Sequence, residues 1–259
     1  MMMNMDINGL SHQQLLLSSY TAALYDKETL KLSIEEKEMI FEDINNFPET
    51  PYHLIDLNKY IYDCTASGFG SRTIAIYTSQ GCPWKCGFCA ENKVTNHRWS
   101  GFNPKRVVDE VKSLVEKNGV NSILIYDTNF VVNKERIRGI FSGLKEKGII
   151  VPFGFINARA DWISDLDEET WKLIKPYIKD VLIGAESGSD KLLDFIDKGI
   201  TVEDLFKAKR VLQKHDITAG YSFMIGLPIP EGFNISVDDE FRLNMQVIKK
   251  LNSIDYDNN

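Results

Sequence analysis

Three cysteines on one short stretch are the feature of this chain that points most directly to chemistry. Cys82, Cys86 and Cys89 are separated by three and then two residues, so one loop can present three thiolates to a single group. Three such cysteines cannot all pair with one another, and a structural zinc site needs four protein ligands. A cubane iron–sulfur cluster usually takes four cysteines. The spacing therefore favours an iron–sulfur cluster with one iron left open to a ligand that is not protein.

The motif Cys-x3-Cys-x2-Cys, with Phe88 directly before its last cysteine, resembles the signature of the radical S-adenosylmethionine (radical SAM) superfamily. The resemblance implies a [4Fe–4S] cluster on Cys82, Cys86 and Cys89, with the open iron chelated by the amino and carboxylate groups of SAM. It also implies that the reduced cluster passes one electron to SAM. This releases methionine and a 5′-deoxyadenosyl radical, which abstracts a hydrogen atom from the substrate. Cys64 lies outside the motif, and we expect a packed thiol there.

Composition and charge exclude several classes of protein. Hydrophobic residues make up 43% of the 259 residues and charged residues 26%, which is typical of a globular protein. The formal net charge of -7 argues against nucleic-acid binding, because proteins of that class usually carry a basic face. The apolar runs are too short to span a bilayer, and no secretion signal opens the chain. With three of its four cysteines in one motif, the chain is expected to be cytoplasmic.

From Thr73 onward, short β-branched runs alternate with helical patterns, the order expected of a parallel α/β sheet. Right-handed crossovers would wind about five to six βα units into a partial barrel, short of the eight of a complete barrel. The resemblance implies the same architecture, with six units, although no sixth strand is visible. Strands are expected at 73–79, 122–127, 152–158, 180–185 and 218–225, and helices at 104–118, 134–147, 167–175, 190–197, 201–215 and 237–251.

The N-terminal quarter of the chain has a different pattern. The stretch from Ser33 to Glu36 is typical of a capping box and predicts a helix through about Ile44, which a proline-containing connector follows. We therefore expect an N-terminal helical cap and connector over 1–62 and the partial barrel over 63–259. The barrel is expected to be truncated at its C-terminal end.

Ligands of parallel α/β barrels lie at the carboxyl ends of the strands, so the polar residues there are candidates for SAM contacts. The segment 184–189 resembles the family's fourth-strand segment, which implies that Glu186 and Ser187 hydrogen-bond the SAM ribose. A carboxylate suits this role because its two oxygens can accept from both sugar hydroxyls. The alternative is that Ser187 or Ser189 caps the following helix while Glu186 is solvated.

Five further residues are expected near SAM. Lys198 matches a basic position that faces the SAM carboxylate in cobalamin-type relatives, although a lysine there is equally expected at a helix C-terminus. Arg159 is a candidate clamp for a carboxylate, or else a salt-bridge partner. Ile225 and Phe88 are expected to flank the adenine. The Gly-Gly-Glu of the family's second-strand loop is replaced here, and Asp127 is expected to accept from the SAM amino group instead.

In detail the chain looks most like radical SAM proteins that usually follow a cobalamin-binding domain. No such domain precedes Met1, so we do not expect cobalamin on this chain alone. The resemblance implies a catalytic barrel that takes electrons from a donor such as flavodoxin or ferredoxin and acts on a substrate that the sequence does not name. The alternative is a non-catalytic iron–sulfur or zinc protein: an electron carrier, a sensor or a degenerate fragment. A thiol-redox enzyme is a weaker third option.

Overall fold

A computed structural model describes residues 13–17, 21–26, 31–36, 43–229 and 232–254 of the chain. The chain divides into two compact units, residues 1–43 and 44–259. None of the helices in the described ranges is both long and apolar enough to cross a membrane.

The described part of the first unit is an antiparallel sheet, not a helical cap. Leu32 and Ile34 alternate with polar residues, which is the period of a strand, and Ile34 pairs with Ala23 of the neighbouring strand. The helix predicted from Ser33 is therefore wrong for these residues, because cross-strand pairing outweighs the local capping signal. The rest of that prediction, over 37–42, lies outside the described residues. The strands, in sheet order, are β1 (Gln13–Leu17), β2 (Thr21–Asp26) and β3 (Lys31–Glu36).

The connector that opens the second unit consists of single 3-10 turns. They are η2 (Ile44–Asn46), η3 (Tyr52–Leu54), η4 (Leu57–Tyr60) and η5 (Thr65–Ser67). Cys64 directly precedes η5 and is a free thiol. Residues 44–62, which the sequence assigned to the N-terminal part, thus belong to the same compact unit as the barrel.

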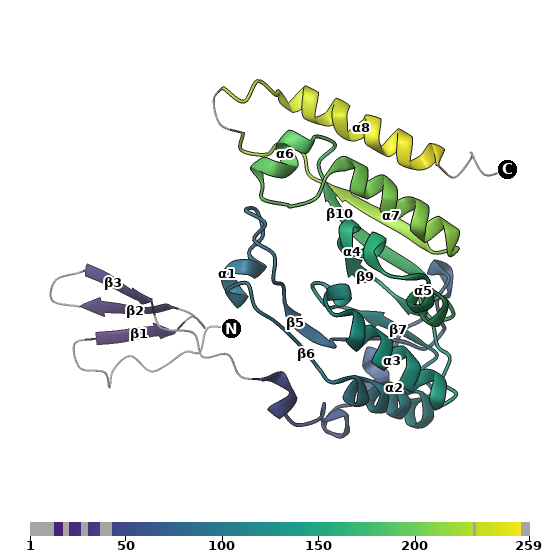
Figure 1. Cartoon of the computed structure of the whole chain (residues 1–259). Helices are drawn as coiled ribbons and strands as arrows, with labels where there is room; N and C mark the ends of the chain where they lie inside the picture. Colours follow the sequence, from purple (N-terminus) through teal and green to yellow (C-terminus); the bar gives the residue numbers. More distant parts are fainter. Residues whose placement is uncertain (1–12, 18–20, 27–30, 37–42, 230–231, 255–259) are drawn as a thin grey trace. The chain divides into compact units, whose positions relative to one another are not determined.

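Parallel strands form the wall of the second unit (Figure 1). They are β4 (Thr73–Ile76), β7 (Ser122–Ile125), β8 (Phe153–Gly154), β9 (Ile156–Ala158), β10 (Asp180–Glu186) and β11 (Thr218–Phe223). One group runs in the order β4-β7-β8 and the other in the order β11-β10-β9. Only Phe155, with a φ of 56°, separates β8 from β9, so the two groups continue into each other. The predicted parallel α/β arrangement is confirmed.

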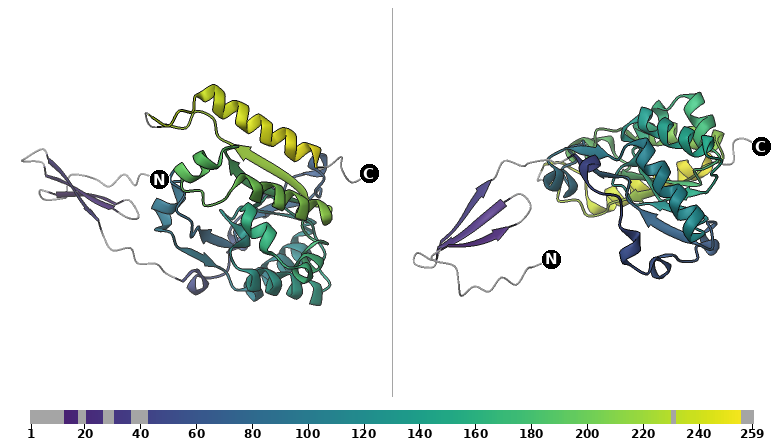
Figure 2. Two further views of the ribbon diagram at one scale, coloured as in Figure 1. Left: turned by 45° about the horizontal axis from the view of Figure 1, so that its top comes forward. Right: turned by 90° about the horizontal axis from the view of Figure 1, so that it is seen from below.

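Helices cover one face of this wall, as two views of the molecule show (Figures 1 and 2). Ile123 and Ile125 of β7 belong to the core on that face, and successive strand residues point to opposite faces. Helix α2 begins at Pro104 and ends before Gly119 (φ 64°), and Asn133 caps α3, all as predicted. The helices are α2 (Pro104–Asn118), α3 (Lys134–Glu146), α4 (Ala160–Asp165), α5 (Glu168–Ile174), α6 (Asp190–Phe195), α7 (Val202–Lys214) and α8 (Val237–Ser253). The residues after 254, where a sixth strand would begin, lie outside the described part.

A short hairpin that the sequence did not predict frames the cysteine motif. The chain leaves β4 at Ile76, three residues earlier than predicted, and then forms β5 (Ser79–Gly81), which pairs with β6 (Trp99–Gly101). A side chain at Gly81 (φ 82°) would collide with the carbonyl of Arg98, so the two strands approach closely only because this residue is glycine. The hairpin, together with α1 (Glu91–Thr95), encloses the loop that carries the cysteines.

Candidate functional site

The three predicted ligands lie on one loop between β5 and α1. Cys82, Cys86 and Cys89 are free thiols, and Cys86 is buried. Burial raises the pKa of the Cys82 and Cys86 thiols, and the neighbouring thiols raise it further, because a second negative charge nearby is unfavourable. All three thiols thus belong to the single loop 82–89.

Backbone and side-chain hydrogen bonds hold the shape of this loop. The N–H of Gly87 donates to the carbonyl of Ile196, just after α6, over 2.8 Å. The carbonyl of Cys86 accepts from the N–H of Cys89 at 3.1 Å and from the Asn92 side chain at 2.6 Å. The loop is thus tied both to itself and to the far side of the barrel.

The donor set fits a cluster better than a single ion. Thiolates on one tetrahedral zinc ion stand about 3.8 Å apart, given Zn–S bonds of about 2.3 Å. Cysteines on a cubane bind different irons and stand farther apart. The loop supplies three free thiols, one fewer than the four protein ligands of a structural zinc site, and three thiolates suit a cubane that leaves one iron open.

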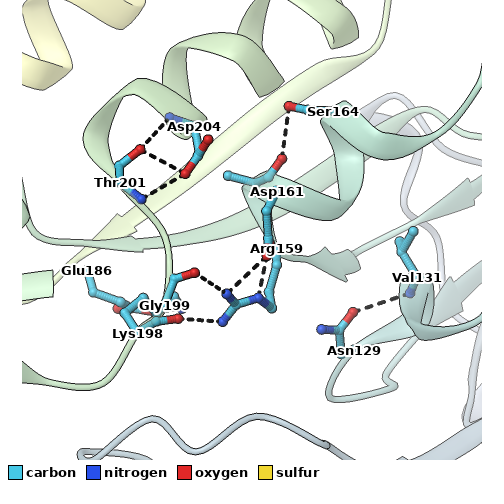
Figure 3. A network of polar contacts seen from close by, with 11 residues as sticks. Asn129, Val131, Arg159, Asp161, Ser164, Glu186, Lys198, Gly199, Thr201 and Asp204 are labelled. Carbon is cyan, nitrogen blue, oxygen red and sulfur yellow. Dashed lines mark hydrogen bonds and ion pairs between the residues drawn. The ribbon is translucent and has the colours of Figure 1, made fainter. Parts of the chain in front are cut away.

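Arg159, a predicted carboxylate clamp, contacts both the segment after α6, as Figure 3 shows, and Trp84 of the cysteine loop. It is 5% exposed, and its Nη1 and Nη2 donate to the carbonyls of Lys198 and Gly199 at 2.6 Å and 3.0 Å. Its Nε forms an ion pair with Asp161 at 3.1 Å, and its guanidinium carbon lies 4.2 Å from the centroid of the Trp84 ring. The carboxylate that it contacts here belongs to its own chain, and a role toward SAM stays a prediction.

Glu186 and Lys198, predicted separately from the sequence, form a buried ion pair (Figure 3). The distance from Glu186 Oε1 to Lys198 Nζ is 3.0 Å, and the residues are 9% and 7% exposed. A Cβ atom at Gly184 would lie 2.9 Å from Nζ and would collide with Oε1, so the pair lies over this glycine. The Lys198 Nζ also lies 5.7 Å from the centroid of the Phe88 ring.

Two features of this pair are costly for stability. Glu186 has a φ of 63°, which is rare for a residue with a side chain, and buried charges lose their hydration. Strained and buried polar residues of this kind cluster at functional sites. The alternative of a solvated Glu186 is wrong. Ser189 occupies the N-cap position of α6, as that alternative expected, but its side chain makes no capping hydrogen bond. Ser187 is fully buried, and its Oγ accepts from the N–H of Ser189.

Asp127 lies at the end of β7, fully buried, and binds the residues that lead into the cysteine loop. Its Oδ1 accepts from the N–H of Thr78, and its Oδ2 accepts from the hydroxyls of Thr78 and Ser79, each at 2.6 Å. Arg136 of α3 donates from Nη2 to the carbonyl of Thr78 at 2.6 Å and to its hydroxyl at 2.7 Å. The predicted contact of Asp127 with the SAM amino group stays a prediction. Sequence reasoning missed Thr78 and Arg136 because their partners are distant in the chain.

Ile225 follows β11 and is 56% exposed, in a segment tied to β10 by the Met224 N–H, which donates to the Glu186 carbonyl at 2.8 Å. Two polar residues of α8, Glu240 and Asn244, also bind this region and were missed. Their signal in the sequence is position, because both lie on the apolar face of an amphipathic helix.

A cavity of about 910 Å³ adjoins the network around Arg159, within the size range of ligand sites. Its lining is Pro83, Trp84, Lys85, Arg159, Asp190, Asp194, Asp197, Lys198, Gly199, Ile200, Thr201 and Asp204.

Comparison with known families identifies the motif region. The pattern of the Radical SAM superfamily matches residues 76–232, which is more than half of the chain. An uncharacterized methyltransferase of Pyrococcus horikoshii is 29% identical over 231 residues, which cover 89% of this chain and 47% of that protein. The anaerobic magnesium-protoporphyrin IX monomethyl ester cyclase of Cereibacter sphaeroides is 30% identical over 186 residues, covering 67% of this chain and 28% of the cyclase. The chain thus spans less than half the length of these relatives.

Two solved structures share the fold. The cobalamin-dependent S-adenosylmethionine radical enzyme OxsB superposes with a TM-score of 0.66 at 20% identity, covering 87% of this chain and 31% of OxsB. The radical S-adenosylmethionine methyltransferase TsrM from Kitasatospora setae superposes with a TM-score of 0.58 at 19% identity, covering 70% of this chain and 34% of TsrM. At these identities the comparison establishes a common architecture, which agrees with the predicted partial barrel.

Proposed function

The chain belongs to the radical SAM superfamily, and we propose that it holds a [4Fe–4S] cluster on Cys82, Cys86 and Cys89 and cleaves SAM reductively. The observation that carries the proposal is that three free thiols share one anchored loop, and that Lys198 of the buried pair with Glu186 lies against Phe88 of the same loop. When bound, such a cluster supplies the electron that converts SAM into methionine and a 5′-deoxyadenosyl radical. Relatives of the chain are named as methyltransferases and cyclases, which supports an enzymatic role.

The protein would stabilise the cluster ligands as thiolates. Cysteine binds metal in its deprotonated form, so positive charge near the loop favours loading. Lys198 and Arg159 both lower the pKa of the Cys86 thiol against the effect of burial, and Arg159 does the same for Cys82. Both cations are themselves buried, so water screens their charge little.

Glu186, Ser187 and Lys198 would orient SAM. Lys198 contacts Oε1 of Glu186, and a carboxylate with two oxygens can accept about four hydrogen bonds, so this pair leaves capacity for the ribose hydroxyls. The ammonium of Lys198 has three donors and can contact the SAM carboxylate while it keeps Glu186. Phe88 and the main chain at Ile225 would flank the adenine, and an Asp127 contact to the SAM amino group remains part of the proposal.

The strand ends also offer an apolar surface for the substrate from which a hydrogen atom would be taken. Tyr77, Tyr126 and Phe155 are 62%, 44% and 48% exposed, and they form edge-on contacts with centroid distances of 6.1 Å and 6.3 Å. Tyr77 and Tyr126 directly follow Ile76 and Ile125, which are buried in the core, so the exposed rings lie where the strands end. Exposed aromatic rings of this kind are typical of ligand sites. An electron donor such as flavodoxin or ferredoxin completes the proposal.

Cluster and SAM chemistry are tested on the purified chain. After anaerobic reconstitution, the protein should contain iron and sulfide in the ratio of a [4Fe–4S] cluster, and with dithionite it should convert SAM into 5′-deoxyadenosine. Zinc near one per chain without sulfide would support the zinc-binding alternative. A stable cluster that never cleaves SAM would support the electron carrier or sensor. Cobalamin added during reconstitution, followed by gel filtration and absorbance, tests whether this chain alone retains that cofactor.

A further inference from the structure

Helix α8 carries two buried polar side chains on a face that is otherwise apolar. Glu240 is 0% exposed and Asn244 is 2% exposed, and both stand in line with Val247 and Leu251, which are buried in the core. Burying a carboxylate or an amide costs free energy unless hydrogen bonds compensate it. An apolar residue at either position would pack without that cost, so the polar side chains require a reason.

Both side chains bind the loops that follow the last two strands. Asn244 Oδ1 accepts from the N–H of Gly188 at 2.6 Å, and its Nδ2 donates to the carbonyl of Met224 at 2.9 Å. Glu240 Oε2 accepts from the N–H of Gly226 at 2.8 Å. Asn244 thus bridges the loop after β10 to the loop after β11, and Glu240 holds the second loop one residue beyond Ile225.

The contact between α8 and the first loop is unusually close. A Cβ atom at Gly188 would collide with the carbonyl of Leu243 and lie 2.8 Å from the N–H nitrogen of Asn244, so only glycine permits this approach. Ser187, predicted to contact the ribose, directly precedes Gly188. The backbone of α8 therefore limits where the Ser187 main chain can lie.

The second oxygen of Glu240 supports a role beyond packing. Its Oε1 is buried without a hydrogen-bond partner within the described ranges. Such unsatisfied groups are rare in folded proteins, and each calls for an explanation. Packing alone would favour a hydrocarbon side chain here, so the bond of Oε2 to the Gly226 N–H is what the carboxylate contributes.

We propose that Asn244 and Glu240 are positioning residues for SAM, which hold the loops after β10 and β11 at the spacing that the ribose and adenine contacts require. This inference rests on the proposed SAM site at Glu186, Ser187 and Ile225. It adds α8 to the binding site without assigning it any contact with SAM or with the reacting atoms.

The first test needs no cofactor and measures backbone amide exchange in the full chain. In Asn244→Ala the N–H of Gly188 should exchange at least tenfold faster, while Asn244→Asp, which keeps the acceptor, should preserve most of the protection. In Glu240→Ala the N–H of Gly226 should lose protection, and Glu240→Gln should lose less. Unchanged exchange at both glycines would overturn the proposal.

The second test measures SAM affinity in the cluster-loaded protein, with thermal unfolding of each variant recorded alongside. Asn244→Ala should weaken SAM binding roughly tenfold, because the two loops would no longer be held in place and would have to be ordered when SAM binds. Val247→Ala is the matched control, because it removes buried contacts from the same helix face without removing a hydrogen bond to either loop, and Asn252→Ala removes an exposed amide. Both controls should bind SAM as the unmodified chain does.

The outcomes separate the two proposals. If the unmodified, cluster-loaded chain fails to bind SAM, the proposed function fails and the role of α8 fails with it. If it binds SAM and Asn244→Ala binds no more weakly than Val247→Ala, only the positioning role is overturned. Weaker binding together with faster exchange at Gly188 supports it.

Discussion

Two buried polar clusters adjoin the cysteine loop, and they differ in how fully their hydrogen-bonding capacity is used. In the Asp127 cluster (Asp127, Thr78, Ser79 and Arg136), both carboxylate oxygens accept bonds from the loop that leads to Cys82. In the Glu186 cluster (Glu186, Lys198 and Arg159), the side-chain hydrogen bond of Glu186 within the described ranges is that to Lys198. A carboxylate saturated by its own chain fixes structure, whereas one with remaining capacity is suited to a ligand.

Strain separates the clusters as well. Glu186 adopts a left-handed backbone conformation (φ 63°), whereas Asp127 is not among the residues with positive φ. The cost of such a conformation is of the order of 1–3 kcal/mol and persists where function retains it. We therefore expect the Asp127 cluster to serve stability and the Glu186 cluster to serve the proposed SAM binding, and the following predictions test that division.

The largest effect is expected from the ligands that both clusters surround. Cys82→Ala, Cys86→Ala and Cys89→Ala should each abolish iron and sulfide retention after anaerobic reconstitution, because three thiolates are the minimum for this cluster. Cys64→Ala is the control and should retain both. Loss of the cluster in Cys64→Ala, or its survival in the other three variants, would contradict the ligand assignment.

The next largest effect is expected from Asp127. In Asp127→Ala three buried donors lose their acceptor and Arg136 loses its nearby anion, so the free energy of unfolding should fall by about 3–5 kcal/mol. Urea denaturation measures this change. Asp165→Ala, which removes a surface ion pair with Lys134, should cost less than about 1 kcal/mol. An Asp127→Ala variant of normal stability with weakened SAM binding would instead favour the contact with the SAM amino group.

Glu186→Ala should act on SAM rather than on the cluster. Loss of a buried charge-assisted hydrogen bond costs about 1.5–3 kcal/mol, or roughly tenfold or more in affinity. Equilibrium dialysis with SAM, paired with iron and sulfide analysis, separates the two effects. Glu203→Ala removes an exposed glutamate from α7 and should leave both unchanged. Unchanged SAM affinity in Glu186→Ala would reject the ribose role.

A pair of glycine substitutions sharpens the comparison with smaller effects. In Gly184→Ala the new Cβ would collide with Oε1 of Glu186, and SAM affinity should fall a few-fold. In Gly101→Ala the new Cβ would lie 2.6 Å from Nε of Arg136 in the Asp127 cluster, and thermal stability should fall instead. In dialysis Gly184→Ala should lose more SAM affinity than Gly101→Ala, and in thermal unfolding Gly101→Ala should lose more stability than Gly184→Ala. If the same variant is the more affected in both assays, the Asp127 cluster and the Glu186 cluster do not have separate roles in stability and SAM binding.

Local patterns predicted much of the barrel. Pro104 and Gly119 bound α2, Asn133 caps α3, and β-branched runs mark the parallel strands, because each signal acts over a few residues. The hairpin of β5 and β6 was missed, since strands of three residues are too short to show a period. The N-terminal strands were missed because a capping signal was read without knowledge of the pairing partner.

The sequence predicted several residues of the candidate site but not which of them contact one another. Glu186 and Lys198 were both named from the sequence, yet their ion pair joins residues twelve positions apart across a helix. Thr78 and Arg136 lie 58 positions apart and Thr78 and Asp127 lie 49 apart, and a single sequence carries no signal for such contacts. Hence the sequence suggested a SAM contact for Asp127, while the structure reveals its bonds to the chain.

The anchoring of the cysteine loop has a consequence for the order of assembly. Asp127 holds the start of the loop, and the bond from Gly87 to Ile196 holds its tip, so most of the backbone entropy of the loop is already lost in the folded chain. A cluster that binds here would therefore enter a loop that is already ordered, and it would not have to fold the chain around itself. In zinc fingers, by contrast, the metal drives folding, and removing it unfolds the domain. Here a chelator should remove the cluster while the barrel stays folded, and the same protein should then bind a new cluster on reconstitution.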